Sequence, residues 1–136
     1  MDLAEALAFI SIHHNAVLST TRRDGHPAMT PVTAGVDTSG RIIISTRETA
    51  LKVRNIGRDP YVSLLVVEDG FYGPWTQIEG RASVLELPDA MEPLVEYYRF
   101  VAGEHPDWAE YRQAMIRDRR VLVRIEVERV GPVVAG

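Results

Sequence analysis

The sequence predicts a small α+β fold, most simply an antiparallel β-barrel of about six strands with helices packed on its outside. Strand-like runs separated by turn signals fill much of the chain, and helical periodicity appears only at the start, in the middle and late. A glycine inside one strand-like run suggests the bend that a barrel wall requires. With 136 residues, 46% of them hydrophobic, we expect one domain over residues 1–136.

A short helix and a β-hairpin are expected at the start of the chain. Asp2 is placed to cap a helix that ends near Asn15, and its apolar side chains recur at helical spacing. The period then changes to that of strands in 16–21 and 27–36. Between these runs stands Asp24-Gly25, a pair typical of a hairpin turn.

The middle of the chain predicts strands on both sides of a short helix. The run 41–46 follows a further turn, so we expect three consecutive strands that are antiparallel neighbours. A helix is expected over 48–56, stopped by the glycine and proline that follow. Strands are then expected over 61–67 and 75–87, and Gly80 inside the second predicts a bulge or a sharp bend.

Two amphipathic helices and a last strand complete the prediction. Apolar residues of 91–101 mark one helix face, which ends at Gly103. A second helix follows Asp107, and its Trp108, Tyr111 and Met115 are expected in the core. In 121–128 the valines and the isoleucine alternate with Leu122 and charged residues, the pattern of a half-buried strand.

Composition excludes several classes of function. There is no cysteine, so no disulfide, thiol nucleophile or thiolate metal site is available, and the four histidines have no ligand at metal-binding spacing. A net charge of −4 argues against nucleic acid as a partner. No apolar run reaches the roughly 18 residues of a membrane span, and the N-terminus lacks the positive charge of a signal peptide. We therefore expect a cytoplasmic protein with neither membrane nor nucleic-acid partner.

Side-chain catalysis alone is poorly supported. The chain has no Gly-x-Ser-x-Gly, His-Glu-x-x-His, Walker or Gly-x-Gly-x-x-Gly motif. An organic cofactor would then have to supply difficult chemistry. Glu79 is a candidate carboxylate, although pairing with the neighbouring Arg81 is the simpler interpretation.

Lys52 marks a candidate anion site. It is the only lysine beside 14 arginines, and it follows Ser45 and Thr46, which end a strand. Free N–H groups at a helix start and two hydroxyls would suit a phosphate, and Lys52 would reach back to it. The same residues also fit a structural interpretation, in which Ser45 and Glu48 form a capping box and Glu48 pairs with Lys52 at i,i+4. Local sequence leaves both interpretations open.

Several segments occur in a fixed order along the chain. They are Asp24-Gly25-His26-Pro27, Thr30-Pro31-Val32, Ile44-Ser45-Thr46, 52–60 with its Lys52-Val53-Arg54-Asn55-Ile56, and Ile78-Glu79-Gly80-Arg81-Ala82. Their order resembles the split β-barrel flavin and deazaflavin oxidoreductases, the pyridoxamine 5′-phosphate oxidase-like proteins. The block 98–115 is similar to an actinobacterial branch that binds coenzyme F-420, a deazaflavin hydride carrier. The resemblance covers nearly the whole chain and implies a six-stranded antiparallel split barrel.

The resemblance also implies a phosphate site. Ser45, Thr46 and Lys52 would bind the cofactor phosphate, with Ala50 and Leu51 beside them. Related proteins often carry a basic residue two positions before the lysine, where this chain has Ala50. A compensating arginine, Arg47 or Arg54, would then be needed.

The rest of the implied site lies along the cofactor ring and across a homodimer. In the resembling proteins two chains form a dimer and each cofactor lies in a groove between them. The backbone of Thr30, Pro31 and Val32 would lie along the ring, and Trp75 and Gln77 would approach it from the second chain. The segment 128–132 lacks the arginine and histidine pair with which pyridoxamine phosphate oxidases hold their substrate, so vitamin B6 oxidation is disfavoured.

We expect a reductase that uses reduced coenzyme F-420 to deliver a hydride to an unsaturated small molecule. The proton would come from water or a nearby hydroxyl, and Tyr72 is a candidate if its loop overhangs the groove. A polyanionic cofactor tail would give a partner to Arg22, Arg23, Arg47 and Arg54. The alternatives are an FMN-dependent pyridoxamine phosphate oxidase-like enzyme on the same barrel and a non-catalytic flavin or deazaflavin carrier.

Overall fold

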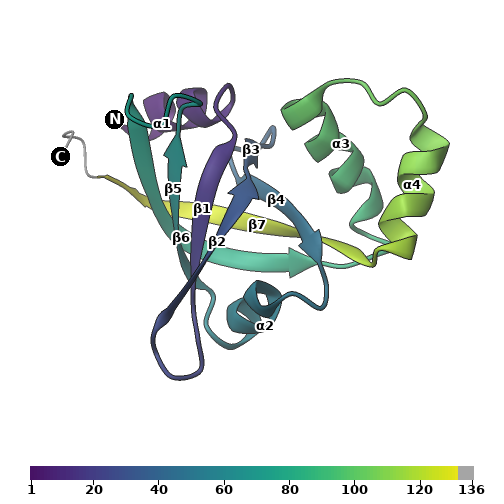
Figure 1. Cartoon of the computed structure of the whole chain (residues 1–136), viewed down its shortest axis with the longest axis horizontal. Helices are drawn as coiled ribbons and strands as arrows, with labels where there is room; N and C mark the ends of the chain where they lie inside the picture. The colour runs from purple at the N-terminus through teal and green to yellow at the C-terminus, as the bar shows by residue number, and fades with distance from the viewer. Residues whose placement is uncertain (132–136) are drawn as a thin grey trace.

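The computed structural model describes residues 1–131, and its helices and strands follow one another largely as expected (Figure 1). Pro132, the last residue of the segment that argued against vitamin B6 oxidation, lies outside the described part. The elements are α1 (Leu3–Ile10), β1 (Asn15–Thr21), β2 (Pro27–Thr33), β3 (Gly35–Val36), β4 (Ile42–Arg47), α2 (Leu51–Arg58), β5 (Tyr61–Val67), β6 (Trp75–Leu85), α3 (Met91–Ala102), α4 (Trp108–Arg117) and β7 (Arg120–Val130).

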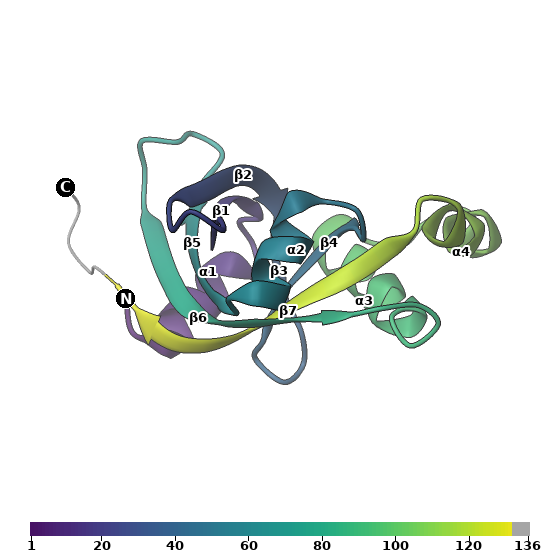
Figure 2. The same ribbon diagram turned by 90° about the horizontal axis from the view of Figure 1, so that it is seen from below.

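The strands form one antiparallel sheet in the order β2-β1-β5-β6-β7-β4-β3, which confirms the predicted α+β split barrel. β2 and β3 stand at opposite ends of this order, yet only Ala34 separates them in the chain. The sheet therefore curls until its two ends approach, as the strands around the barrel show (Figure 2). The described part has seven strands where six were predicted, because the run 27–36 divides at the buried Ala34.

The prediction of three consecutive antiparallel neighbours is half right. β1 pairs with β2, and β3 pairs with β4, as expected. However, β2 and β4 do not pair with each other, because the bend at Ala34 sends the chain to the other end of the sheet. The long partner of β4 is β7, in a register that runs from Ile42 opposite Ile125 to Arg47 opposite Arg120.

Gly80 marks a bulge in β6, as predicted. The register between β6 and β7 shifts between Glu79 and Gly80. A Cβ added at Gly80 would lie 2.1 Å from the backbone oxygen of Glu126, so only glycine allows the two strands to approach this closely. The bulge lets β6 and β7, the longest strands, bend as they run from the barrel to α3 and α4 (Figure 2).

Two apolar clusters hold the fold together. The first fills the barrel, where alternate residues of β1 and β5 point inward. The second lies outside the barrel, beside α3 and α4 (Figure 1). It joins Ile43 and Leu122 to buried residues of these two helices. Leu122 had been assigned to the polar side of the last strand, and this was wrong, because it is 1% exposed beneath the helices. β4 and β7 are thus apolar on both faces at this point, so the alternation of apolar and polar residues does not show which side chains are buried.

The helix boundaries differ from the prediction by a few residues. Asp2 and Glu5 form a capping box at the start of α1, but the helix ends at Ile10 because Asn15 already pairs with strands on both sides. α2 begins and ends later than expected and runs through Gly57. No helix within residues 1–131 is long and apolar enough to cross a lipid bilayer.

Candidate functional site

A groove of about 700 Å³ opens where the edge strand β2, the end of β4 and the helices α3 and α4 meet. The groove is lined by Asn15, Pro31, Val32, Thr33, Ser45, Thr46, Lys52, Tyr97, Tyr98, Tyr111, Met115 and Arg120. A space of about 330 Å³, here called the side cavity, shares two of these residues with the groove. The side cavity is lined by Thr46, Arg47, Thr49, Ala50 and Arg120.

The groove brings together five of the residues that were predicted to bind the cofactor. Pro31 and Val32 come from β2, Ser45 and Thr46 from β4, and Lys52 from the first turn of α2. The Nζ atom of Lys52 lies 3.5 Å from the Oγ1 atom of Thr46, so the ammonium group and the hydroxyl occupy one spot. The lysine therefore does reach back to the end of the strand, as the anion-site interpretation requires.

Five predicted residues lie elsewhere in this chain. Ala50 lines the side cavity, while Leu51 points into a separate hollow on another face of α2. Thr30 belongs to β2 but does not line the groove, and its Oγ1 atom is buried with no hydrogen-bond partner among residues 1–131. Trp75 and Gln77 begin β6, away from this groove, so their approach from a second chain stays a prediction.

The structural interpretation of Lys52 is wrong. Ser45 belongs to strand β4, and α2 starts after Ala50, which makes no side-chain cap hydrogen bond. Glu48 forms an ion pair with Arg119 rather than with Lys52. Arg119 lies far along the chain, so this competing partner could not be read from the local spacing of Glu48 and Lys52.

Positive charge at the groove is not balanced by any acid. None of the residues that line the groove or the side cavity is acidic. Within residues 1–131, Arg47, Lys52 and Arg120 form no ion pair. Burial, with a smaller contribution from the charge of Arg120, lowers the pKa of Lys52 from its usual value. The site is therefore suited to an anionic ligand.

Arg120 is the groove residue that the sequence analysis missed. It follows Arg117 and Arg119 in the chain, so it looked like ordinary surface charge at the start of a strand. The pairing of β7 with β4 places it directly opposite Arg47. Its Nε atom is buried and has no hydrogen-bond partner among residues 1–131. The only local signal was the arginine run itself.

Tyrosines form the wall of the groove on the helix side. The Tyr97 hydroxyl donates a 2.8 Å hydrogen bond to the backbone oxygen of Thr33, and the Tyr111 hydroxyl donates a 2.7 Å bond to that of Leu94. Burial raises the pKa of Tyr97 and raises that of Tyr111 to about 12. Tyr98, by contrast, makes no hydrogen bond through its hydroxyl within the described residues. Tyr111 is in the core, as predicted, but it also faces the groove.

Only alternate residues of β2 have backbone groups free for a ligand. The N–H of Arg22 donates to the oxygen of His26, and the N–H of Ala34 donates to that of His14. In this register the even-numbered residues of β2 occupy the hydrogen-bonded pairs with β1. The polar backbone groups of odd-numbered residues therefore point to the open edge of the sheet.

This alternation refines the predicted ring contact. The backbone groups of Thr30 and Val32 face β1, whereas those of Pro31 face the edge. Proline has no N–H, so Pro31 offers only its carbonyl oxygen, and the free N–H groups beside it belong to Met29 and Thr33. The contact of Thr30, Pro31 and Val32 with a ring stays a prediction, and of the three residues Pro31 has its backbone polar group at the open edge of the sheet.

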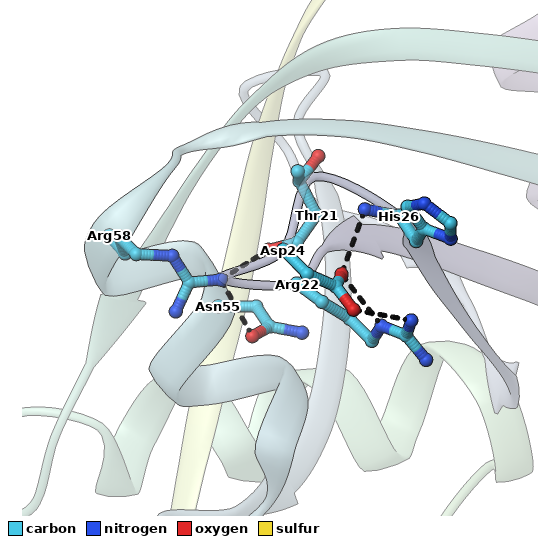
Figure 3. A network of polar contacts seen from close by, with 6 residues as sticks. All are labelled: Thr21, Arg22, Asp24, His26, Asn55 and Arg58. Carbon is cyan, nitrogen blue, oxygen red and sulfur yellow. Dashed lines mark hydrogen bonds and ion pairs between the residues drawn. The ribbon is translucent and has the colours of Figure 1, made fainter.

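A second basic hollow, of about 720 Å³, is formed by residues of the β1–β2 hairpin and of α2. Figure 3 shows how some of these residues contact one another. It is lined by Arg22, Arg23, Asp24, Leu51, Arg54, Asn55 and Arg58. The predicted cluster of four arginines is therefore divided, because Arg47 lines the side cavity instead. Arg58 donates hydrogen bonds to the Thr21 backbone oxygen and to the Asn55 side chain, which ties α2 to the hairpin.

Asp24 organises the tip of the same hairpin. It accepts hydrogen bonds from the Arg22 side chain at 3.1 and 2.7 Å and from the backbone N–H of His26 at 3.0 Å (Figure 3). These contacts, led by the one from Arg22, lower the pKa of Asp24. The predicted turn at Asp24-Gly25 is confirmed, and Gly25 adopts a φ of 86° that suits glycine.

Two other candidates stand apart from the groove. Tyr72 is 94% exposed on the loop before β6 and does not line the groove of its own chain. Glu79 lies 3.7 Å from Arg129, while Arg81 lies near Glu128. Glu79 does pair with an arginine, as expected. However, the partner is Arg129 on the neighbouring strand β7 and not Arg81 on the same strand.

The chain is similar to known proteins over nearly its whole length. The chain is 30% identical over 127 residues, 93% of its length and 84% of the relative, to the F-420H(2)-dependent biliverdin reductase of Mycobacterium tuberculosis. A conserved hypothetical protein of the same organism has a solved structure with a TM-score of 0.78 and 28% identity, over 96% of this chain and 82% of that one.

More distant structures share the fold. One described as an F-420 reductase gives a TM-score of 0.70 at 16% identity, over 91% of this chain and 94% of that one. A putative pyridoxamine 5′-phosphate oxidase of Listeria innocua gives 0.69 at 20% identity, over 96% and 97%. The family model described as Pyridoxamine 5′-phosphate oxidase matches residues 3–133. The chain therefore belongs to the pyridoxamine 5′-phosphate oxidase family.

Proposed function

We propose that this protein is an oxidoreductase that binds coenzyme F-420 in the groove and transfers a hydride to an unsaturated organic substrate. The observation that carries the proposal is the unbalanced positive charge of Lys52 and Arg120 beside the hydroxyls of Ser45 and Thr46. A cofactor phosphate would neutralise that charge. The relative named F-420H(2)-dependent biliverdin reductase supports a deazaflavin as the cofactor.

The residues of the groove fit a phosphate-bearing cofactor. The buried Nε atom of Arg120 lacks a partner among residues 1–131, and Lys52 has no acid to neutralise it. Ser45, Thr46 and Lys52 would hold the phosphate. The ring would lie against the open edge of β2 at Pro31, where a carbonyl oxygen faces outward.

When bound, the cofactor supplies the hydride, and the chain supplies position and charge. The Tyr97 and Tyr111 hydroxyls already donate to backbone oxygens, and the raised pKa of each makes it a weak acid. A proton for the reduced substrate would therefore come from water or from the Tyr98 hydroxyl, which no such bond occupies. Tyr72 would take part only if it entered the groove of a second chain.

We also propose that the protein works as a homodimer. The outer face of β1, β2 and β5 has no helix over it and exposes Val17, Met29 and Leu65. One cross-strand row on this face runs Pro31, Val17, Leu65, Gln77, and the next row runs Thr33, Asn15, Val67, Trp75. The predicted second-chain residues thus share a surface with the groove edge, as a two-fold interface would require.

A pair of substitutions tests the dimer. Leu65→Glu places a charge in the middle of this face and should give a monomer by light scattering, with loss of cofactor binding. Ile116→Glu adds the same charge to an exposed side chain on α4, away from the face, and should leave both properties unchanged. A wild-type protein that is monomeric and still binds cofactor would exclude this part of the proposal.

Titration of the purified protein with F-420 and with FMN tests the cofactor. We expect the tighter binding for F-420, whereas tight FMN binding with undetectable F-420 binding would favour the FMN-dependent alternative. Stopped-flow oxidation of the reduced cofactor with enones, quinones and tetrapyrroles then tests turnover. Binding without any acceleration would indicate a carrier protein instead of an enzyme.

A further inference from the structure

We infer that Arg120 of β7 is the second cation of the phosphate site, in the role that a basic residue at position 50 would otherwise have. The inference rests on the proposed function. It adds a phosphate-binding residue from a part of the chain that is remote in sequence from the β4–α2 loop. Arg120 and Thr46 are the two residues that line both the groove and the side cavity. Arg120 is therefore placed between Lys52 on one side and Ala50 on the other.

The positive charges around Arg120 favour an external anion. Arg47 is its direct partner across β4 and β7, and Lys52 is close enough for Arg120 to lower its pKa. Like charges placed in this way repel one another. The carboxylate that follows β4 belongs to Glu48, and Arg119 already binds it. Within residues 1–131 the three cations are therefore left without a counterion.

The chemistry of Arg120 also suits a phosphate oxygen. Arg120 lines the groove, and its Nε–H is buried and unpaired within the described residues, although an unpaired buried donor is costly. A guanidinium presents its donors in a planar fork that matches phosphate oxygens. Arg124, on the same strand, also has a buried unpaired Nε, but it lines neither space, so only Arg120 can meet a ligand there.

The small side chain of Ala50 leaves open space beside Arg120. Its methyl group makes no cap hydrogen bond for α2 and leaves the side cavity open beside Arg120. A long basic side chain at position 50 would project into the same space. Positions 50 and 120 are therefore alternative places for one positive charge. The test is to remove the charge at position 120 and to add one at position 50.

Cofactor titration of four variants tests the exchange. Arg120→Gln should weaken binding of F-420, or of FMN if that is the cofactor, by roughly ten-fold to a hundred-fold, the value of a charge-assisted contact. Arg117→Gln removes the same charge from an exposed residue of α4, which pairs with Glu110 and lines neither space, and should change affinity by less than about two-fold. Adding Ala50→Arg to Arg120→Gln should recover most of the affinity, whereas Ala50→Gln should not.

Thermal unfolding with inorganic phosphate gives a readout that is independent of the cofactor. Phosphate should raise the Tm of the unchanged protein and of Arg117→Gln, and raise that of Arg120→Gln much less. The inference is overturned if phosphate stabilises Arg120→Gln as strongly as the unchanged protein, or stabilises neither. If the unchanged protein binds neither cofactor and the phosphate effect still depends on Arg120, the anion site stands and the proposed function fails.

Discussion

Arg47 and Arg120 lie directly opposite each other on the antiparallel strands β4 and β7, and both line the side cavity. Neither forms an ion pair within residues 1–131, so their repulsion is uncompensated. Arg47→Thr should therefore raise the free energy of unfolding of the cofactor-free protein by about 0.2–1 kcal/mol. Urea unfolding at low and high salt is the measurement, and the gain should shrink at high salt. Arg41→Thr, which breaks the ion pair with Asp37, should instead lower stability.

Lys52 should contribute more to the free energy of cofactor binding than to the stability of the fold. Lys52→Ala should weaken cofactor binding roughly ten-fold to a hundred-fold, because a charge-assisted phosphate contact is lost. Calorimetric titration measures the change, and Arg112→Ala, which removes a charge paired with Glu92 on α3, is the control. Unchanged affinity together with a lower Tm would mean that the lysine serves the structure only.

Cofactor affinity should fall at alkaline pH because of Lys52. Burial and Arg120 lower the pKa of its ammonium group below the usual 10.5, so the charge is lost earlier than in an exposed lysine. The cofactor-free protein binds this proton less readily than the unfolded chain, so its stability should rise with pH between the lowered pKa and 10.5. The dissociation constant should increase over the same interval. In Lys52→Arg, whose guanidinium stays charged, the affinity should be nearly independent of pH there.

The bulge in β6 should tolerate no side chain at Gly80. A Cβ at this position would lie 2.1 Å from the Glu126 backbone oxygen, so Gly80→Ala must push β6 and β7 apart. We expect a loss of about 1–3 kcal/mol in the free energy of unfolding. Gly57→Ala is the matched control, because that glycine lies in α2 with open space around it. It should stabilise the protein by about 0.4–1 kcal/mol, and equal effects of the two changes would contradict the assignment of the bulge.

The Tyr97 hydroxyl should hold the groove edge of β2 in place. Tyr97→Phe removes its hydrogen bond to the Thr33 oxygen and should cost about 0.5–1.5 kcal/mol of unfolding free energy, with weaker cofactor binding as β2 loosens. Tyr98→Phe, whose hydroxyl has no partner among residues 1–131, should leave stability unchanged. Denaturant unfolding of the two variants compares them directly. A larger loss in Tyr98→Phe would show that its hydroxyl has a partner after all.

Much of the fold could be predicted because its signals are local. The capping box at Asp2 and the hairpin turn at Asp24 each depend on residues within a few positions of one another, and the bulge in β6 was indicated by the single glycine Gly80. The prediction failed where a distant residue competed with a local one. The capping box of Ser45 and Glu48 had suitable spacing, but Arg119 binds Glu48 and the helix begins later.

Only the part of the candidate site that lies close together in sequence could be predicted. By itself, the sequence determined an α+β barrel and grouped Ser45, Thr46 and Lys52, because a strand that runs into a helix keeps such residues within a few positions. Only the tertiary structure decided that Arg120 joins them, that Leu51 and Arg47 lie in separate spaces, and that Pro31 faces the open edge. The physical reason is that strand pairing and barrel closure set which remote side chains meet, and the charge left unbalanced there becomes visible only when the strands are paired.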